Sequence, residues 1–312
     1  MTHDRIGFAG TPEFGLTVLQ ALANTNYGIP LVITRPDRPV GRSRDPQPTP
    51  VRKWAVKHGL KVETPKTAEE LYAVLKKANL DLLVVAAYGM ILRKKALQAP
   101  KRGCVNVHAS LLPDYRGASP IQQAILDGRT ETGVTIMKMD EGLDTGPILD
   151  RKKVPIAPDD DYLTLSAKLA VEGGKLLVKV IPDFLSGMKP ENQGEPTTLL
   201  TKPLKRTDGV INWEQPAEKI LLHIRARRGW PGANRRFGEQ RIEILEAEES
   251  NGPPLQPDVA VEEKGNLFVG TGSGIPLLIT RLQPPGKNPM DASDWLRGYR
   301  GNLNGQSASD SD

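Results

Sequence analysis

The chain has 312 residues, a length that favours two domains over one hydrophobic core. Its 42 Lys and Arg residues against 37 Asp and Glu give a net charge of +5, which permits a polyanionic partner without requiring one. A single cysteine, Cys104, excludes an internal disulfide and argues against a cysteine-based zinc site. The sequence has no apolar run long enough for a membrane span and no secretory signal, so we expect a cytoplasmic protein.

Short apolar runs alternate with helical patterns through the first half of the chain, which predicts a parallel sheet with helices on both sides. The run at 81–87 (DLLVVAA) is continuously apolar, as expected of a strand covered on both faces. The predicted strands are 5–9, 30–34, 81–87, 103–108, 132–138 and 147–154. The predicted helices are 13–22, 51–58, 69–78 and 162–185. We therefore expect an α/β first domain.

The turn after the first predicted strand reads GTPEFG, with Thr11 as the expected N-cap and Pro12 at the first helical position. This pattern is not GxGxxG, so it favours a sharp turn without a bound nicotinamide cofactor.

The composition changes at 186–198 (SGMKPENQGEPTT). This segment has no apolar periodicity and is predicted to be a linker. A helix at 217–225 and short strands at 241–245, 258–262, 266–270 and 276–282 then predict a small β-barrel. We expect a first domain at 1–186, a linker at 187–206, a second domain at 207–303 and a disordered tail at 304–312.

Chemistry-bearing residues are densest between 106 and 146. Asn106 and His108 are two apart at the end of a predicted strand, so their side chains leave the same face. They would point into the crevice beyond the carboxyl end of the strand, where open α/β sheets bind ligands. The loop SLLPDYRGASP follows, and then a Gly-rich loop that carries Asp140, Glu141 and Asp144. A carboxylate from that loop would orient the His108 ring and favour its protonated form.

An amide, an imidazole and a carboxylate without a metal set suit acyl transfer through a tetrahedral intermediate. Asn106 and His108 would donate hydrogen bonds to the developing oxyanion, where losing one donor costs roughly 3 to 4 kcal/mol. An amine nucleophile would need no nucleophilic side chain, because an α-amino group with a pKa of about 7.7 to 8.0 is partly neutral near pH 7. Asp144 would fix His108 and help a water move the proton from the attacking nitrogen.

Six segments, in order along nearly the whole chain, resemble the methionyl-tRNA formyltransferase family. They are FAGTPEF, RPDRPVGR at 35–42, AAYGMIL at 86–92, NVHASLLPDYRGASPIQ at 106–122, ETGVTIMKMDEGLDTGPIL at 131–149, and INWEQPAEKI with IRARRGWPGA within 211–233. The stretch from Asn106 to Pro113 is shared by the wider group of formyltransferases that use 10-formyltetrahydrofolate. The opening segment, the 35–42 loop and the second domain favour an aminoacyl-tRNA acceptor.

The resemblance implies a Rossmann-like first domain and a second domain with an oligonucleotide-binding (OB-like) barrel. It implies a formyl donor, 10-formyltetrahydrofolate, no metal, and Asn106, His108 and Asp144 as the catalytic set. The implied folate-binding residues are Ser110, Leu111, Leu112, Pro113, Tyr88, Gly89 and Ile91.

The resemblance also implies that the 35–50 loop reaches toward the acceptor end of initiator methionyl-tRNA, with Arg42 as its main contact. Arg44, a charged residue of the same loop, is a further candidate. The window 202–241 has ten basic and four acidic residues, a net charge of +6, and phosphate contact is a reasonable use of it. Arg206, Arg227 and Arg228 are the candidates there. Trp213 and Trp230 could stack on bases, but we expect them to pack the small barrel.

The nearest alternative is a formyltransferase acting on a small amine, such as an amino sugar nucleotide. Two others are a non-catalytic RNA-binding protein and a hydrolase that releases formate from the same donor. A monomer is the default expectation.

Overall fold

The computed structural model describes residues 4–39 and 45–304 and divides into two compact units. Unit 1 comprises Met1–Pro120, Glu131–Ile156 and Leu165–Lys202; unit 2 comprises Ile121–Thr130, Ala157–Thr164 and Pro203–Asp312. In the described ranges, no helix is both long and apolar enough to cross a membrane. The predicted boundaries at residues 186, 206 and 303 stay a prediction.

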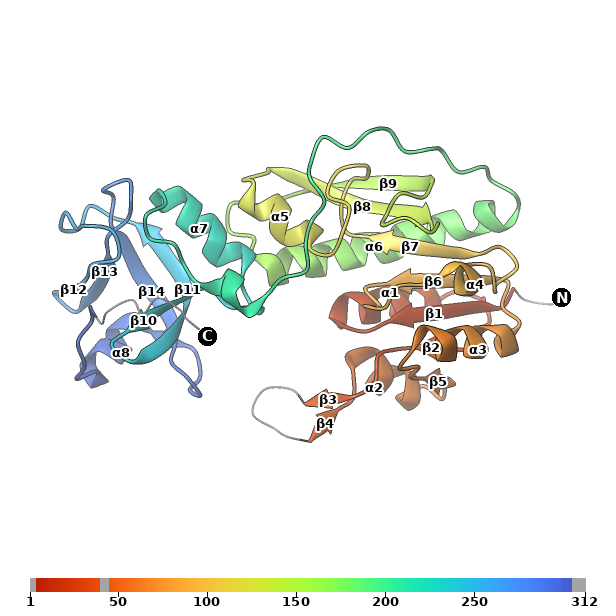
Figure 1. Ribbon diagram of the computed structural model, residues 1–312, viewed down its shortest axis with the longest axis horizontal. Helices are drawn as coiled ribbons and strands as arrows, with labels where there is room; N and C mark the ends of the chain where they lie inside the picture. The colour runs from red at the N-terminus through yellow and green to blue at the C-terminus, as the bar shows by residue number, and fades with distance from the viewer. Residues whose placement is uncertain (1–3, 40–44, 305–312) are drawn as a thin grey trace. The chain divides into compact units, whose positions relative to one another are not determined.

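Unit 1 is built on a seven-stranded sheet with the order β5-β2-β1-β6-β7-β8-β9 (Figure 1). The strands are β1 (Ile6–Gly10), β2 (Val32–Ile33), β5 (Val62–Glu63), β6 (Leu82–Ala86), β7 (Cys104–His108), β8 (Glu131–Lys138) and β9 (Ile148–Pro155). β5, β2, β1, β6 and β7 are parallel, which confirms the expected α/β sheet. β8 runs antiparallel to both of its neighbours, so the parallel order ends at β7.

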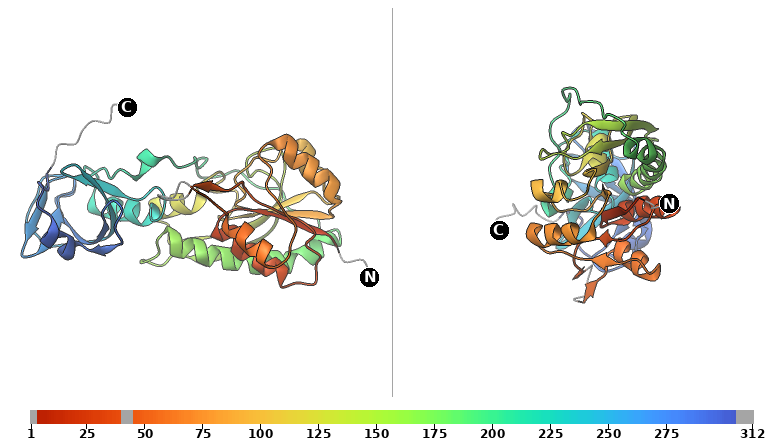
Figure 2. Two further views of the ribbon diagram at one scale, coloured as in Figure 1. Left: turned by 90° about the horizontal axis from the view of Figure 1, so that it is seen from below. Right: turned by 90° about the vertical axis from the view of Figure 1, so that its right-hand side faces the viewer.

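Helices cover both faces of this sheet because its central strands are apolar on both faces. All five residues of β6 are buried, as the run of apolar letters predicted. Figure 2 shows α6, in green, along one side of the sheet and α3, in orange, on the other. The helices are α1 (Glu13–Ala23), α2 (Pro50–Lys57), α3 (Ala68–Ala78), α4 (Lys94–Leu97) and α6 (Tyr162–Leu185), and a short hairpin pairs β3 (Arg38–Pro39) with β4 (Pro46–Gln47).

The turn between β1 and α1 differs from the expected cap. Pro12 occupies the N-cap position, and the Thr11 hydroxyl instead donates to the Tyr88 carbonyl over 2.8 Å. A Cβ at Gly15 would lie 2.7 Å from the Ala86 carbonyl oxygen, so this glycine lets α1 pack directly on β6. The GTPEFG segment is therefore a packing turn that joins β1 to the loop after β6.

Unit 2 contains a curled antiparallel sheet with the order β10-β11-β14-β13-β12, and β15 pairs with β14. Its elements are α7 (Ala217–Ala226), β10 (Asn234–Phe237), β11 (Gln240–Glu249), β12 (Ala260–Glu263), β13 (Asn266–Val269), β14 (Leu277–Gln283), β15 (Met290–Asp291), α8 (Ala292–Gly298) and the 3-10 helix η1 (Arg206–Gly209). The predicted small barrel-like fold is confirmed. α5 (Pro120–Leu126), β10 and α8 were missed, because none of them carries a long periodic pattern.

The core of unit 2 is a cluster of apolar side chains from the sheet, α7 and α8. Trp213 is 4% exposed and belongs to this cluster, as expected. Trp295 lies edge-on to Phe237 with ring centroids 5.2 Å apart. Trp230 is 51% exposed, so the prediction that it packs the barrel is wrong.

His223 gives unit 2 a pH-dependent stability. Burial on α7, with a smaller contribution from the Arg227 charge, lowers the pKa of His223 from 6.5 to about 4. The unfolded chain therefore binds a proton between pH 6.5 and 4 that the folded chain does not, so stability falls as the pH falls through this window. We expect about 1 to 2 kcal/mol of loss from this group between pH 7 and pH 5.

Three of the four tryptophans lie in unit 2, so urea unfolding followed by tryptophan fluorescence reports on it. In His223→Gln the free energy of unfolding should vary less between pH 7 and pH 5 than in the wild type. An identical pH dependence in the two proteins would contradict this role.

Candidate active site

Asn106 and His108 lie on β7, toward the carboxyl end of this strand in the unit 1 sheet. Asn106 is half-buried and His108 is 5% exposed. The strand lies between β6 and β8, with His108 beside Thr135 of β8. Since residues two apart in a strand share a face, the amide and the imidazole belong to the same side of the sheet. The structure thus places His108 at the carboxyl end of β7, as the sequence predicted, and Asn106 two residues earlier on the same face.

The His108 ring lies between two oxygen acceptors. Its Nε2 is 3.0 Å from the Tyr115 carbonyl oxygen, and its Nδ1 is 3.7 Å from Oδ2 of Asp144. A carbonyl only accepts hydrogen bonds, so Nε2 carries a proton in this arrangement. The Asp144 carboxylate stands at ion-pair distance on the other side, where it can stabilise a protonated ring. The predicted pairing of Asp144 with His108 is present in this geometry.

Asp144 reaches His108 because the loop between β8 and β9 folds back over the sheet. β8 ends at Lys138, which pairs with Val105 at the other end of β7, yet Asp144 lies beside His108. Asp144 adopts a left-handed backbone conformation (φ 54°), which Asp tolerates better than most residues. Its Oδ2 accepts a hydrogen bond from the Gly117 amide over 2.9 Å. The carboxylate is therefore held by the loop that follows β7.

Residues inside the Asp144 loop also hold its shape. Oδ1 of Asp140 accepts hydrogen bonds from the Gly142 amide (3.0 Å) and the Thr145 hydroxyl (2.8 Å). Lys94 of α4 pairs with Glu141 over 3.2 Å. Asp140 and Glu141 thus shape the loop and attach it to α4.

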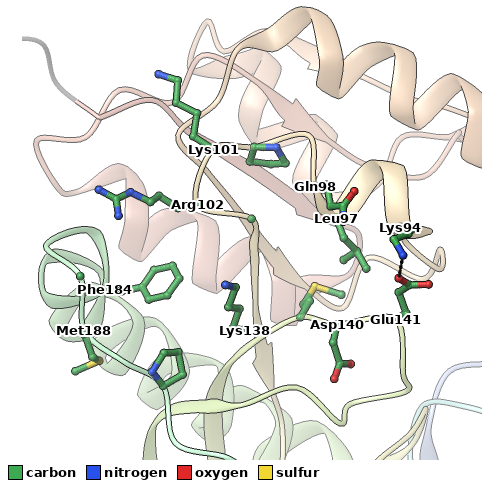
Figure 3. A pocket seen from close by; sticks show the side chains of 15 residues that line it. Lys94, Leu97, Gln98, Lys101, Arg102, Lys138, Asp140, Glu141, Phe184 and Met188 are labelled. Atoms are coloured by element: carbon green, nitrogen blue, oxygen red, sulfur yellow. Dashed lines mark ion pairs between the residues drawn. The ribbon is translucent and has the colours of Figure 1, made fainter.

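A cavity of about 610 Å³ lies beside this loop, between α4, the start of β7 and the end of α6 (Figure 3). Its lining includes Met139, Asp140 and Glu141, together with the basic residues Lys101, Arg102 and Lys138. The folate-binding residues predicted from the sequence are not among its lining residues. The cavity and Asp144 therefore share one loop, while the predicted donor residues lie elsewhere in unit 1.

The predicted donor residues after β7 are largely occupied by internal contacts. Ser110 is fully buried, and its hydroxyl donates to the Asp114 carbonyl over 2.7 Å. Leu112 is 1% exposed and packs with Met137 and Ile148. The Leu112–Pro113 bond is cis. Leu111 is half-buried. The side chains of Ser110 and Leu112 therefore stabilise the interior of the loop. The loop follows His108 directly in the chain.

The predicted donor residues after β6 differ from one another in exposure. Tyr88 is 2% exposed, and burial raises the pKa of its hydroxyl to about 12. Gly89 has a φ of 77°, a conformation that favours glycine. Ile91 is 79% exposed, so it is the member of this group whose side chain is free to meet a ligand.

The candidate tRNA contacts fall into three groups. Arg42 and Arg44 lie outside the described residues. Arg206 is exposed in η1 of unit 2. Arg227 is 9% exposed and donates from Nε to the Asp208 carbonyl over 3.1 Å, while Arg228 stands 3.6 Å from Asp161. The burial of Arg227 argues against phosphate contact by this side chain, since its guanidinium is turned into unit 2.

The contacts of residues 191–202 with the loops around His108 could not be anticipated from the sequence. This segment, here called the strap, reads as a linker by composition, yet Thr198 Oγ1 accepts from the Tyr115 amide over 2.7 Å. Thr201 exchanges backbone hydrogen bonds with Arg116 and Ala118. Gln193 bonds to the Asp144 loop. A lone glutamine within a polar stretch gives no periodic signal, so only the fold reveals these partners.

Family comparisons agree with this architecture. The Formyl transferase model matches residues 5–181, and the Formyl transferase, C-terminal domain model matches residues 203–300. Methionyl-tRNA formyltransferases from Halorhodospira halophila and Trichlorobacter lovleyi are 44% and 40% identical, over 95% and 96% of this chain and 96% and 95% of theirs. The Bacillus subtilis enzyme of that name is 40% identical over 94% of each chain.

Solved structures share the fold at lower identity. HypX from Aquifex aeolicus, in complex with tetrahydrofolic acid, has a TM-score of 0.68 at 15% identity, over 95% of this chain and 47% of that chain. An N-formyltransferase from Helicobacter canadensis, in complex with folinic acid and dTDP-3-aminofucose, has a TM-score of 0.66 at 20% identity, over 90% and 99%. With both formyltransferase domain models matched and relatives of 40% identity or more along nearly its full length, the chain belongs to the methionyl-tRNA formyltransferase family.

Proposed function

We propose that this protein transfers the formyl group of 10-formyltetrahydrofolate to the α-amino group of initiator methionyl-tRNA, a cytoplasmic reaction of translation initiation. The observation that carries the proposal is the His108 ring, held between the Tyr115 carbonyl and the Asp144 carboxylate at the end of β7. The chain that contains this ring aligns along nearly its full length with methionyl-tRNA formyltransferases. A monomer stays the expectation for its working unit.

The reaction begins when the neutral α-amine attacks the formyl carbon and the formyl oxygen gains negative charge. His108 donates from Nε2 and Asn106 from its amide to this oxyanion. To do so, the Nε2–H group leaves the Tyr115 carbonyl and donates to the formyl oxygen. The new hydrogen bond is stronger because its acceptor is charged. Each donor contributes roughly 3 to 4 kcal/mol of transition-state stabilisation.

The proton balance requires one proton to leave the attacking nitrogen and one to reach N10 of the folate as the carbon–nitrogen bond breaks. Asp144 supports both transfers by holding His108 and by stabilising positive charge on its ring. A water between the attacking nitrogen and the Asp144 carboxylate takes the first proton, and the same water and carboxylate return a proton to N10 as its bond to the formyl carbon breaks. Formylated methionyl-tRNA and tetrahydrofolate leave.

The folate donor occupies the side of the site formed by the segments after β6 and β7. The exposed side chain of Ile91 and the backbone around Tyr88 and Gly89 face the pteridine, and the backbone of 110–113 borders the formyl group. Supporting this, the Thr11 hydroxyl fixes the Tyr88 carbonyl, and Thr135 accepts from the Leu112 amide over 3.1 Å. These contacts keep the donor-facing backbone in place before the ligand arrives.

The tRNA is held through phosphates by exposed basic side chains. Arg206 is exposed and stays a candidate. Arg228 also stays a candidate, although it is half-buried and stands 3.6 Å from Asp161, whereas Arg227 supports the interior of unit 2. Other exposed basic residues of this unit are Lys205, Lys219, Arg236 and Arg241. Such contacts supply affinity that does not depend on base sequence.

Arg42→Ala tests the loop outside unit 2. A charge-assisted contact to phosphate contributes roughly 1.5 to 3 kcal/mol, so the KM for methionyl-tRNA should rise about 10- to 100-fold. The KM for the folate donor should stay within about twofold. Arg151→Ala, on the exposed part of β9, is the matched control. Equal KM values for tRNA in Arg42→Ala and the wild type would remove Arg42 from the interface.

The function itself is tested by incubating the protein with formyl-labelled donor and methionyl-tRNA. Label should appear on the aminoacyl ester and be released as formylmethionine by mild alkali. Parallel reactions contain deacylated tRNA, an amino sugar nucleotide or no acceptor. Label on the amino sugar alone, or formate released without an acceptor, would assign the site to a different reaction.

A further inference from the structure

Gln193 lies in the strap, which crosses unit 1 between the end of α6 and η1 (Figure 1). The strap pairs with the sheet at Glu191, opposite Ile148, and with the loop after β7 at Thr201, opposite Gly117. Between these points Gln193 is half-buried. The segment that reads as a linker is thus fastened along the catalytic side of the sheet.

The side-chain amide of Gln193 uses its full hydrogen-bonding capacity. Nε2 donates to the carbonyl oxygens of Asp144 (2.9 Å) and Gly146 (2.6 Å). Oε1 accepts from Nε (3.0 Å) and Nη2 (2.8 Å) of Arg116. A carboxamide offers two donors and two acceptor lone pairs, and here all four are engaged. A fully satisfied group of this kind holds its neighbours in one arrangement.

Gln193 therefore connects the two loops that contact the His108 ring. Arg116 lies between Tyr115, whose carbonyl accepts from His108, and Gly117, whose amide donates to Asp144. On the other side, Gln193 holds the backbone of Asp144 itself. The Asp144 carboxylate is thus fixed relative to His108 through its side chain by Gly117 and through its main chain by Gln193.

We propose that Gln193 is a positioning residue that sets the Asp144 carboxylate relative to His108. Asp144 sits in a left-handed conformation between Gly142 and Gly146, so its loop has other backbone conformations open to it once the two carbonyl bonds are lost. A displacement of about 1 Å in a catalytic group can cost about 10²-fold in rate. The inference rests on the proposed function, because formyl transfer is its readout.

The strap has other attachments that do not involve Gln193. Asp114 accepts hydrogen bonds from the amide (2.6 Å) and the hydroxyl (2.8 Å) of Thr197. Thr198 and Thr201 add the contacts described above. Replacing Gln193 should therefore leave the strap in place and the chain folded, so that its effect on catalysis can be measured separately.

The experiment is a double-mutant cycle between Gln193 and Asp144, measured on the full chain with methionyl-tRNA. Gln193→Ala should lower kcat about 10- to 100-fold and leave both KM values within about threefold. In the Asp144→Asn background, where the carboxylate is absent, the same change should cost less than about threefold under single-turnover conditions. Gln193→Glu, which places anionic oxygen against two carbonyl oxygens, should be as slow as Gln193→Ala.

Thr197→Val is the matched control, since it removes one strap hydrogen bond without touching the Asp144 loop; its kcat should stay within about threefold of the wild type. Gln193→Met, which keeps the length of the side chain, replaces Gln193→Ala if that variant melts early in circular dichroism. Wild-type kcat in Gln193→Ala, a loss carried by KM alone, or an equal loss with and without the Asp144 carboxylate would each overturn the inference. A wild-type protein that does not formylate methionyl-tRNA would refute the proposed function instead.

Discussion

Replacing His108 with alanine should lower formyl transfer by at least about 10³-fold while donor binding changes little. The ring supplies an oxyanion donor whose loss alone costs roughly 10² to 10³ in rate. Its ring also stands 3.7 Å from the Asp144 carboxylate, which would stabilise positive charge on the ring as the reaction proceeds. Since both effects arise only as charge develops on the formyl oxygen, the KM values should move far less than kcat.

Single-turnover transfer of labelled formyl groups to methionyl-tRNA measures this loss, and fluorescence titration with a folate analogue measures binding. His108→Ala also removes the hydrogen bond from the ring to the Tyr115 carbonyl, so His108→Gln serves as a second variant that keeps a donor in the side chain. His58→Ala removes a ring that stacks on Trp54 and should change kcat less than twofold. Turnover in His108→Ala within tenfold of the wild type would remove His108 from the mechanism.

Replacing Asp144 with asparagine should lower kcat roughly 10³-fold at neutral pH with little change in thermal stability. Asparagine tolerates the left-handed backbone conformation (φ 54°) and can still accept from the Gly117 amide. What it lacks is the negative charge that stabilises a protonated His108 ring. Asp144→Ala should be equally slow and also less stable, because alanine is strained by about 1 to 2 kcal/mol in that conformation.

The loss in Asp144→Asn is read from kcat by single turnover, with melting temperature as the check on folding. Asp150→Asn, at an ion pair with Lys179 on the exposed side of β9, is the matched control and should retain wild-type kcat. An Asp144→Asn enzyme within threefold of the wild type would show that the carboxylate does not contribute through its charge.

Much of the catalytic unit can be predicted from local pattern. The continuous apolar run of β6 indicated a strand buried on both faces, and the spacing of Asn106 and His108 placed them on one face at a strand end. Asp144 was identified because a carboxylate in a Gly-rich loop suits the orientation of a histidine. The apolar run of β6 and the spacing of Asn106 and His108 are each local, so they can be read without knowledge of the fold, whereas Asp144 lies 36 residues after His108 and its contact with the ring depends on the fold.

Other features of the site depend on partners that are distant in the chain. Gln193 lies 49 residues from Asp144 and 77 from Arg116, in a stretch whose composition predicted only a linker. Arg227 and Arg206 look alike in the sequence, yet the first is buried and the second exposed. Trp230 likewise became an exposed residue, although its apolar character favoured the core.

The sequence by itself determined the longer strands and helices of unit 1, the order of the two folds along the chain, and the identity of the residues at the end of β7. Those properties follow from hydrophobic periodicity and from side-chain spacing along one strand. Only the tertiary structure decided that Asp144 folds back to His108, that the Tyr115 carbonyl is the second partner of its ring, and that the strap binds both loops. Those contacts join segments far apart in the chain, and hydrogen-bonding groups of the same kind are too common in a sequence for their pairing to be read from it.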